Sequence, residues 1–229
     1  MEKENSGRVL VLSCDVSVLD DDVVFDRLFA SASPARREKT QALRFRPDKN
    51  LSLGAEYLLA EACREFGLDL ASLTAQAGPG EKPGFPGSGV SYNLSHSGTR
   101  AICVMSAYEC GCDIEQIDKA DLRVASRYFA PEECAQLDSC RSEEEKRELF
   151  YRLWTLKESY MKCTGLGFRL ALGAFAVSAE KGAPRLLRGA DEAEYSFFEP
   201  EPPAGYRCSV CVRAPAGEFF TDVRKIVIP

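Results

Sequence analysis

The pattern of apolar and polar residues along the chain predicts both helices and short strands. Residues 9–12 form an apolar run of strand length. Ser33 followed by Pro34 predicts a helix start, because a serine side chain caps free N–H groups and proline fits the first helical turn. A second helix is predicted between Pro47 and Gly67, where apolar residues recur at helical spacing and the glycine is expected to end the helix.

Strands are predicted in the middle of the chain. Apolar and polar residues alternate over residues 90–94, and residues 101–107 form a second strand-like run. Residues 95–98 between them are polar or glycine, so they are expected to turn the chain. Residues 77–89 are the segment richest in glycine and proline, which predicts a loop. A third strand is expected to contain or end at residues 113–115.

The longest predicted helix covers residues 143–164. Ser142 and Glu145 have the spacing of a capping box, and Gly165 is expected to end the helix. Shorter segments are predicted on either side: helices at 124–128 and from 131, then strands at 174–179, 194–198, 206–213 and 223–228. Helices and strands therefore mix along the whole chain, which predicts the α+β class.

Composition and charge narrow the class of protein. The 229 residues suffice for one large domain or two small ones. The formal net charge is 29 − 35 = −6, which argues against a general nucleic-acid binder. No apolar run approaches the ~20 residues of a membrane helix, and the N-terminal residues lack the apolar core of a signal peptide. We therefore expect a cytoplasmic monomer with no nucleic-acid and no membrane partner.

Ten cysteines and one histidine limit the metal chemistry. The cysteine spacing is irregular, so reduced thiols packed in the core are expected rather than a disulfide framework. Cys208 and Cys211 match C-x-x-C, but they lie in strand-like sequence that would point the two thiols to opposite faces. A zinc site built on several histidines is excluded.

Asp113 and Glu115 are the first candidate for chemistry. Two residues apart on a strand, their side chains leave the same face. Such a pair of carboxylates suits Mg²⁺, which is typically bound by one or two carboxylates together with substrate phosphates and water. The alternative is a solvated strand face, and the spacing alone favours it.

The predicted helix over residues 143–164 contains the second candidate set. Lys157 falls inside the apolar arc of this helix, so its amine either extends to solvent or meets a buried anion. Glu158 and Lys162 are four residues apart on one side of the helix. A surface ion pair worth ~0.3–0.5 kcal/mol would explain those two residues but not Lys157.

Residues 93–98 are the third candidate. Ser95, His96 and Ser97 bring two short hydroxyl side chains and an imidazole together at a predicted strand end, which suits a phosphate ligand. A serine nucleophile with His96 as its base is disfavoured, because adjacent residues on a strand point apart.

These three places together resemble a known family. The matching stretches are NLSHSG (93–98), GCDIE (111–115) and FYRLWTLKESYMKCTGLG (150–167), the last with a W-x-x-K-E-x-x-x-K signature. Weaker matches are RREK (36–39), an E-K-P turn at 81–83 and RYFAPEE (127–133). Between residues 36 and 167 the sequence is similar to 4′-phosphopantetheinyl transferases of the surfactin-synthetase-activating type.

The resemblance implies a fold and an activity. The fold would be two similar α/β halves in a pseudo-twofold arrangement, with residues 1–107 on the side of the coenzyme A 3′-phosphate and adenine and residues 108–229 carrying the metal and the catalytic helix. The reaction would transfer the 4′-phosphopantetheine arm of coenzyme A to a serine of an apo acyl or peptidyl carrier protein. Adenosine 3′,5′-bisphosphate would leave, and Mg²⁺ would be required, with Mn²⁺ as the alternative metal.

The resemblance also implies roles for individual residues. Metal ligands would be Asp113, Glu115 and Glu158, and catalysis would rest on Glu158 as the base and Lys162 as the group that neutralises the leaving phosphate. Phosphate contacts would come from Ser95, His96 and Lys157, and the nucleotide end would be held by Arg36, Lys39 and Lys82. Asn50 stands where family members often have an arginine, so the grip on the 3′-phosphate is expected to differ.

Two other functions remain open at the level of sequence. One is a non-catalytic module that binds coenzyme A or a nucleotide, although such a module has no need of the set Asp113, Glu115, Glu158 and Lys162. The other is a different Mg²⁺-dependent phosphotransferase, but the chain lacks the G-x-x-x-x-G-K-[ST] loop of P-loop enzymes. The sequence does not say whether the carrier belongs to fatty-acid, polyketide or peptide synthesis.

Overall fold

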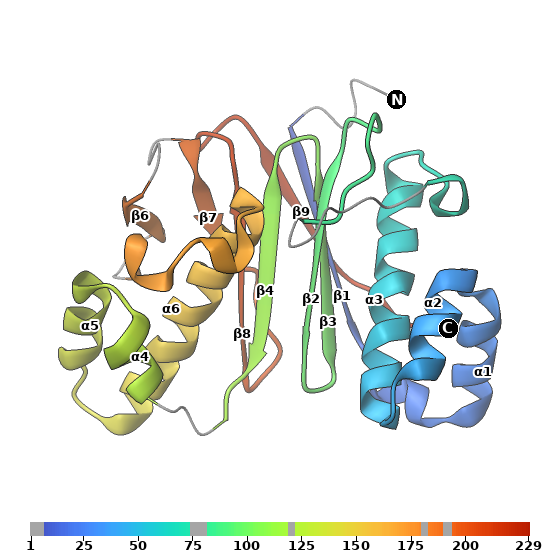
Figure 1. Ribbon diagram of the computed structural model, residues 1–229, viewed down its shortest axis with the longest axis horizontal. Helices are drawn as coiled ribbons and strands as arrows, with labels where there is room; N and C mark the ends of the chain where they lie inside the picture. Colours follow the sequence, from blue (N-terminus) through green and yellow to red (C-terminus); the bar gives the residue numbers. More distant parts are fainter. Residues whose placement is uncertain (1–6, 74–81, 119–121, 180–182, 190–193) are drawn as a thin grey trace.

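Two β-sheets stand next to each other in the middle of the molecule, and helices cover their outer sides (Figure 1). The computed structural model describes residues 7–73, 82–118, 122–179, 183–189 and 194–229. Each half of the molecule pairs one sheet with its own helices, so the predicted α+β class is confirmed.

The first half contains a four-stranded sheet in the order β2-β3-β1-β9. Its strands are β1 (Arg8–Asp15), β2 (Ser91–Ser97), β3 (Arg100–Ser106) and β9 (Phe220–Lys225). Only the β1–β9 pair is parallel among the described strands. Its helical elements are η1 (Ser17–Asp20), α1 (Asp22–Ser31), α2 (Pro34–Ala42), α3 (Arg46–Glu65) and η2 (Leu70–Ser72). Leu10 and Leu12 of β1 pack with Leu53 and Leu58 of α3, which anchors this helix on the sheet.

The second half contains a three-stranded sheet in the order β4-β8-β7 and a separate pair, β5-β6. Its strands are β4 (Cys110–Gln116), β5 (Ala176–Ser178), β6 (Arg185–Arg188), β7 (Ser196–Phe198) and β8 (Tyr206–Val212). Its helical elements are α4 (Arg123–Tyr128), α5 (Pro131–Asp138), α6 (Glu143–Thr164), η3 (Gly167–Arg169) and η4 (Leu172–Ala174). Leu153 and Leu156 of α6 are fully buried, so this long helix forms the centre of its half.

A third apolar cluster joins the two halves. Val9 and Val11 of β1 point away from α3 and pack with Ile114 of β4 and Val210 of β8. The strands in the middle of the molecule are therefore buried on both faces. The domain boundary expected at 107/108 falls on the short link between β3 and β4. Strand β9, from the end of the described chain, returns to the first sheet. The division into two domains at that point stays a prediction.

Helix ends follow the expected capping chemistry, with one difference. The Ser33 hydroxyl accepts a hydrogen bond from the Arg36 N–H at 3.2 Å, which confirms the start of α2. Gly165 adopts a φ of 69° after α6, which confirms the end of that helix. The predicted capping box of α6 is half formed, because Glu145 accepts from the Arg141 N–H instead of the Ser142 N–H.

Three segments differ from the predicted elements. Helix α3 begins at Arg46, before the expected break, because Pro47 fits its first turn. Helix α1 was not predicted, and its start is capped by Asp21, which accepts hydrogen bonds from two backbone N–H groups. Residues 95–97 were expected to turn the chain, but they continue β2, and the turn comes at Gly98.

The cysteines behave as core residues. All ten are free thiols, and eight of them are buried. Cys208 packs in the cluster between the sheets and Cys211 in the cluster beneath α6, so the two thiols point to opposite faces of β8 as predicted. Burial raises the pKa of Cys110 and of Cys112 to about 12. None of the helices in the described ranges is long and apolar enough to cross a membrane.

Candidate active site

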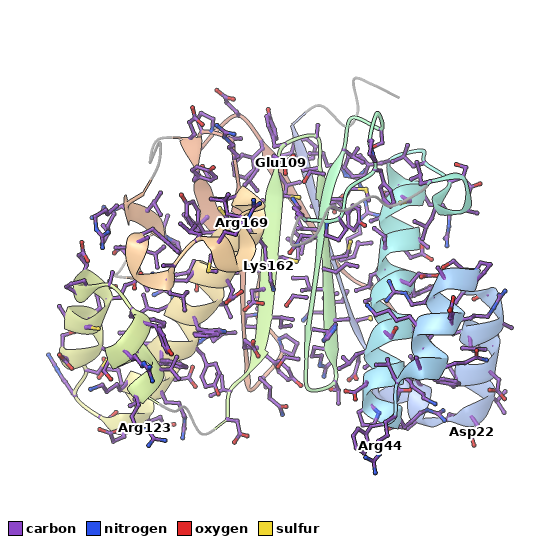
Figure 2. The ribbon with its side chains drawn as sticks, viewed as in Figure 1. Asp22, Arg44, Glu109, Arg123, Lys162 and Arg169 are labelled. Carbon is purple, nitrogen blue, oxygen red and sulfur yellow. The ribbon has the colours of Figure 1, made fainter. Side chains whose placement is uncertain are left out.

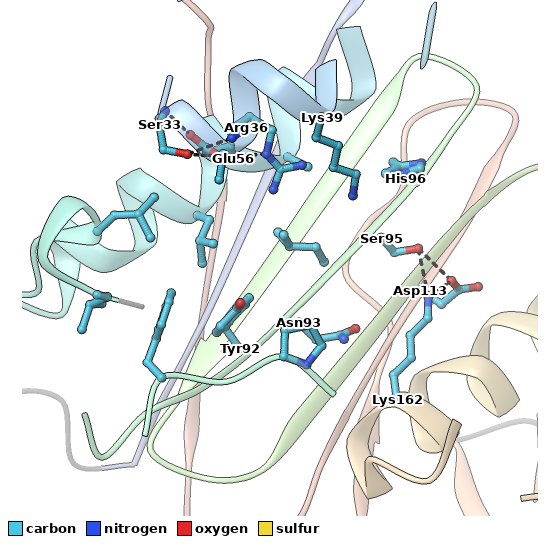
Figure 3. Close-up of a pocket in the computed structure, with 18 of the residues that line it drawn as sticks. Ser33, Arg36, Lys39, Glu56, Tyr92, Asn93, Ser95, His96, Asp113 and Lys162 are labelled. Atoms are coloured by element: carbon cyan, nitrogen blue, oxygen red, sulfur yellow. Dashed lines mark hydrogen bonds and ion pairs between the residues drawn. The ribbon is translucent and has the colours of Figure 1, made fainter. Parts of the chain in front are cut away.

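A cleft of about 1130 Å³ runs across the molecule from α2 and α3, over β2 and β4, to α6. Eight of the residues predicted for the site line this cleft: Arg36, Lys39, Ser95, His96, Asp113, Glu115, Glu158 and Lys162. Figure 3 shows Arg36 and Lys39 at one end and Asp113 and Lys162 at the other. The cleft therefore has a basic end in the first half and a largely acidic end in the second.

Asp113 of β4 is the most buried acid of the cleft, with 3% of the residue exposed. Its Oδ1 accepts from Lys162 Nζ at 2.6 Å and from Ser95 Oγ at 2.8 Å. Its Oδ2 is also buried and has no hydrogen-bond partner within the described ranges. A buried carboxylate oxygen without a partner is costly, so this atom is suited to a ligand that enters the cleft.

Two further acids lie near Asp113. The Glu115 Oε2 atom accepts from Ser97 Oγ at 2.8 Å. Glu158 of α6 has no hydrogen bond or ion pair to the described part of the chain, although it lines the same cleft. Two residues apart on β4, Asp113 and Glu115 both face the cleft, as their spacing predicted.

The surroundings of the three acids make their charged forms less favourable. Burial raises the pKa of Asp113, although Lys162 and Ser95 oppose the rise. Burial and the negative charge of Asp113 raise the pKa of both Glu115 and Glu158. A bound cation would remove this repulsion, because it favours the charged form of all three carboxylates.

The carboxylates of the cleft fit a Mg²⁺ ion that is bound partly by the protein and partly by a phosphate ligand, rather than an ion enclosed by the protein alone. Among the residues that the structure describes, no three acidic, histidine or cysteine side chains lie close enough together to enclose a metal by themselves. Mg²⁺ does not require such a cage, because it commonly takes one or two protein carboxylates and fills its other positions with phosphates and water. The unpartnered Oδ2 of Asp113 and the uncommitted Glu158 are oxygen donors of this kind.

Lys162 lies between α6 and β4 (Figure 2). Its Nζ atom contacts Asp113 and lies 3.2 Å from Ser95 Oγ. Burial lowers the pKa of Lys162, but the Asp113 carboxylate outweighs this effect and the net pKa is raised. Lys162 is therefore a charged ammonium group at the acidic end of the cleft.

The basic end is partly neutralised by Glu56. Arg36 Nε donates to Glu56 Oε2 at 2.7 Å, and the Ser33 N–H donates to Glu56 Oε1 at 2.7 Å. Lys39 extends into the open cleft (Figure 3), where its amine has no hydrogen bond or ion pair with any described residue. Lys39 is thus the more available cation for an anionic ligand.

His96 lies on β2 between the two ends and is exposed to the open cleft. Its partial burial by the cleft walls lowers its pKa, and the positive charges of Lys162, Lys39 and Arg36 lower it further. The ring is therefore biased towards the neutral form, which can both donate and accept a hydrogen bond.

Several lining residues were not predicted from the sequence. An apolar wall of the cleft includes Leu59, Phe85 and Tyr92, with the two rings stacked at 4.7 Å between centroids. Trp154 was expected only to extend an apolar helix face, but it also lines the cleft, where its indole N–H opposes the rise in the pKa of Glu115. Only the position of Trp154 next to Glu158 on α6 could have predicted from the sequence that Trp154 lines the cleft. Nothing in the sequence predicted this for Glu56.

The structure corrects two predicted contacts. Lys157 does not line the cleft: it is fully buried, and its Nζ lies 2.6 Å from Glu133 Oε1 and 3.0 Å from the Phe175 carbonyl oxygen. Five residues before Lys162 on the helix, it points to a different side, so it cannot reach a phosphate in the cleft. Lys82 also does not line the cleft, because its amine donates to Ser91, Glu109 and the Cys110 carbonyl.

Asn50 has a structural role instead of replacing a phosphate-binding arginine. It is 2% exposed, and its side chain donates to Asp20 at 2.8 Å and accepts from Arg46 at 3.0 Å. These contacts fix the first turn of α3 against η1. Asn50 is not among the residues that line the cleft.

Comparisons of the sequence with known proteins point to one family. The model of the 4′-phosphopantetheinyl transferase superfamily matches residues 109–211. A 4′-phosphopantetheinyl transferase of Bacillus subtilis is 28% identical over 193 residues, which cover 83% of this chain and 86% of that protein. The 4′-phosphopantetheinyl transferase Sfp of Bacillus subtilis strain 168 is 28% identical over 206 residues, which cover 88% and 90%. The holo-[acyl-carrier-protein] synthase of Thermotoga maritima aligns with a TM-score of 0.40 at 16% identity, over 47% of this chain and 64% of that chain.

Proposed function

Because the chain belongs to the 4′-phosphopantetheinyl transferase superfamily, we propose that it transfers the 4′-phosphopantetheine arm of coenzyme A to a serine of an apo carrier protein. The reaction would require Mg²⁺ and release adenosine 3′,5′-bisphosphate. One observation carries the proposal: a single cleft contains Asp113, Glu115, Glu158 and Lys162 at one end and Arg36 and Lys39 at the other.

The charge pattern of the cleft fits a long ligand with phosphates at two places. Lys39 and Arg36 would contact the 3′-phosphate, and His96 would donate a hydrogen bond to the pyrophosphate. The Ser95 hydroxyl lines the same part of the cleft, but its one proton is donated to Asp113. The volume of about 1130 Å³ exceeds that of a typical small-ligand pocket, as a ligand of the size of coenzyme A requires. The apolar wall around Phe85 and Tyr92 would exclude water from one side of it.

Mg²⁺ would be held by Asp113, Glu115 and Glu158 and would supply charge neutralisation at the pyrophosphate oxygens. Mn²⁺ has similar ligand preferences and could replace it. The protein's contribution is to present three partly buried carboxylates along one cleft. Burial raises the pKa of all three acids, and the negative charge of Asp113 raises the pKa of Glu115 and Glu158 further, so a divalent cation would favour their charged forms.

Glu158 would act as the general base. It is the acid of the cleft with no partner in the described part of the chain, so one of its oxygens is free to accept the proton of the carrier serine hydroxyl. Its raised pKa makes it a stronger base than an exposed glutamate. The serine oxygen then bonds to the phosphorus that carries the pantetheine, and the bridging P–O bond to the adenosine 5′-phosphate breaks.

Lys162 would stabilise the leaving group. Its ammonium is held by Asp113 at 2.6 Å, which fixes its direction in the cleft. The remaining N–H donors can neutralise the negative charge that builds up on the departing 5′-phosphate. Asp113 therefore serves both as a metal ligand and as the orienting partner of Lys162.

The test is a transfer assay with the full chain, coenzyme A, Mg²⁺ and a panel of purified apo carrier proteins. The expected result is a carrier whose mass increases by one phosphopantetheine arm. Glu158→Gln should reduce the transfer rate by ~10²–10⁴-fold, because general-base catalysis contributes an effect of this size. Glu144→Gln, an exposed position on the same helix, is the matched control and should keep the wild-type rate.

One outcome would contradict the transferase activity, and another would contradict only the role of Glu158. Binding of coenzyme A without modification of any carrier in the panel would indicate a binding module. A wild-type rate for Glu158→Gln would remove Glu158 from the role of base while leaving the transferase activity itself in place.

A further inference from the structure

Strands β2 and β4 lie next to each other but belong to different sheets, and side chains join them. Four backbone N–H groups of β4 each donate to a side-chain oxygen of β2. The pairs are Cys110 to Ser91 at 3.4 Å, Cys112 to Asn93 at 3.0 Å, Ile114 to Ser95 at 3.4 Å and Gln116 to Ser97 at 3.1 Å. Alternate residues of β2 thus satisfy the backbone donors of the β4 edge, as the two-residue period of a strand allows.

We call this row of contacts between β2 and β4 the seam. Its three serines, Ser91, Ser95 and Ser97, also share a second contact. Each serine hydroxyl accepts from the backbone N–H of one residue and donates its own proton to the side-chain carboxylate of the residue directly before it. Ser91 donates to Glu109 at 3.1 Å, Ser95 to Asp113 at 2.8 Å and Ser97 to Glu115 at 2.8 Å. Because the incoming N–H occupies one side of the oxygen, the hydroxyl proton is directed towards the carboxylate.

We propose that Ser97 is a positioning residue that holds Glu115 in the orientation needed to bind the divalent metal. Ser97 is not among the residues that line the cleft, so it acts through Glu115. Its hydroxyl donates to Oε2 of that carboxylate, and Glu115 itself lines the cleft. The proposal rests on the proposed function, since it takes Glu115 to be a metal ligand.

The position of Ser97 is itself set by the second half of the molecule. The turn that follows it is held at Tyr206 of β8, whose hydroxyl accepts from the Thr99 N–H at 3.1 Å. Gly98 has a φ of 56°, and a Cβ there would lie 2.4 Å from Gln116 Oε1 and from Tyr206 Oη. The tip of the β2–β3 hairpin is therefore fixed against β4 and β8, and Ser97 is fixed with it.

Ser91 provides a matched control within the same seam. It accepts from a β4 N–H, as Ser97 does, and donates to the carboxylate of Glu109. Unlike Ser97, it also accepts from Lys82 Nζ at 2.7 Å. The residue that accepts from Ser91, Glu109, precedes β4 (Figure 2) and does not line the cleft. Removal of either hydroxyl should weaken the seam to a similar extent, but only Ser97 should affect metal binding.

The experiment measures Mn²⁺ binding to the full chain by electron paramagnetic resonance of the free ion, together with unfolding in urea. Ser97→Ala should weaken Mn²⁺ binding about 10–100-fold, the usual effect of losing a hydrogen bond to a ligating carboxylate. Ser97→Thr keeps a hydroxyl and should restore binding. Ser91→Ala should lower the urea midpoint as Ser97→Ala does, with unchanged Mn²⁺ binding. In the transfer assay, Ser97→Ala should raise the Mg²⁺ concentration that gives half of the maximal rate.

The possible failures are distinguishable. Equal Mn²⁺ affinity for wild type, Ser97→Ala and Ser91→Ala would overturn the role of Ser97 and leave the proposed function untouched. A wild-type chain that transfers the arm but binds no Mn²⁺ would overturn the metal assignment of Glu115, and the role of Ser97 with it. A wild-type chain that modifies no carrier would overturn the proposed function itself.

Discussion

Two lysines of α6 show how the same residue type has different roles on one helix. Lys162 reaches Asp113 in the cleft, whereas Lys157 reaches Glu133 in the core, where both side chains are 0% exposed. Glu133 also accepts hydrogen bonds from the N–H groups of Ala130 and Val177. The pair therefore ties α5 and β5 to α6, and it has no contact with the cleft.

Removing one partner of this buried pair should destabilise the fold strongly. Lys157→Ala leaves the Glu133 carboxylate buried without its cation, which typically costs about 3–5 kcal/mol. Unfolding in urea, followed by circular dichroism, measures the loss. Lys146→Ala, which removes a more exposed pair with Asp138 at the start of the same helix, should cost less than about 1 kcal/mol. Similar losses for the two variants would contradict a structural role for the buried pair.

At the scale of single residues, the sequence predicted which side chains are important but not which residues they contact. The spacing of Lys157 on an apolar arc predicted either solvent contact or a buried anion, and the second is correct. The identity of that anion depends on how α5 packs on α6, 24 residues away in sequence. Asn50 and Glu56 were beyond reach for the same reason, because their partners come from other helices and turns.

The placement of α6 on β4 depends on a glycine. A Cβ at Gly111 would lie 2.2 Å from the Ser159 carbonyl oxygen and 2.4 Å from the Cys163 backbone nitrogen. Both atoms belong to the backbone of α6, so the helix lies directly on the strand at this point. This close approach allows Lys162 of the helix to reach Asp113 of the strand at 2.6 Å.

Gly111→Ala should push α6 away from β4 and separate the two acids of the strand from Glu158 and Lys162 of the helix. A displacement of about 1 Å can cost 10²-fold in rate, so the transfer rate should fall by at least that factor. Gly84→Ala is the control, because a Cβ at Gly84 meets nothing within 4 Å. Steady-state kinetics of both variants, with circular dichroism to verify folding, would check this. A folded Gly111→Ala variant with the wild-type rate would show that the spacing is not critical.

Among the elements, those with strong local signals were predictable. Capping residues and apolar spacing located α2 and α6, and alternation located β2 and β3. Residues 95–97 were assigned wrongly to a turn because they are polar in sequence. Ser95 and Ser97 are polar within a strand because their hydroxyl oxygens accept from backbone N–H groups of β4, a partner that the local sequence does not reveal.

At the scale of the whole molecule, a charged network ties the last described strand to the first. Arg8 of β1 contacts Glu65 of α3 at 2.8 Å and Asp222 of β9 at 2.7 Å. Arg224 of β9 contacts the same two acids at 3.0 Å and 2.8 Å. The hydrogen bond from Arg8 lowers the pKa of Glu65, and the hydrogen bond from Arg224 lowers the pKa of Asp222.

This network should make stability depend on pH on the acid side. A carboxyl whose pKa is lower in the folded state contributes stability above its unfolded pKa of about 4, and that contribution is lost as the pH falls through the folded value. Arg8→Met should therefore cost about 1 kcal/mol at pH 7, and its difference from wild type should shrink below pH 4. Urea unfolding at several pH values measures this. Arg64→Met, which removes an exposed pair within α3, should show no such convergence.

The parallel pairing of β9 with β1 also has a consequence for how the protein is made. On the ribosome, β1 is synthesised more than two hundred residues before the strand that completes its sheet. Until then the edge of β1 is open, and Ile228 cannot take its buried place beside α1 to α3. Strand β1 therefore leaves the ribosome long before its parallel partner, and its unpaired edge is exposed to premature pairing until β9 has also emerged.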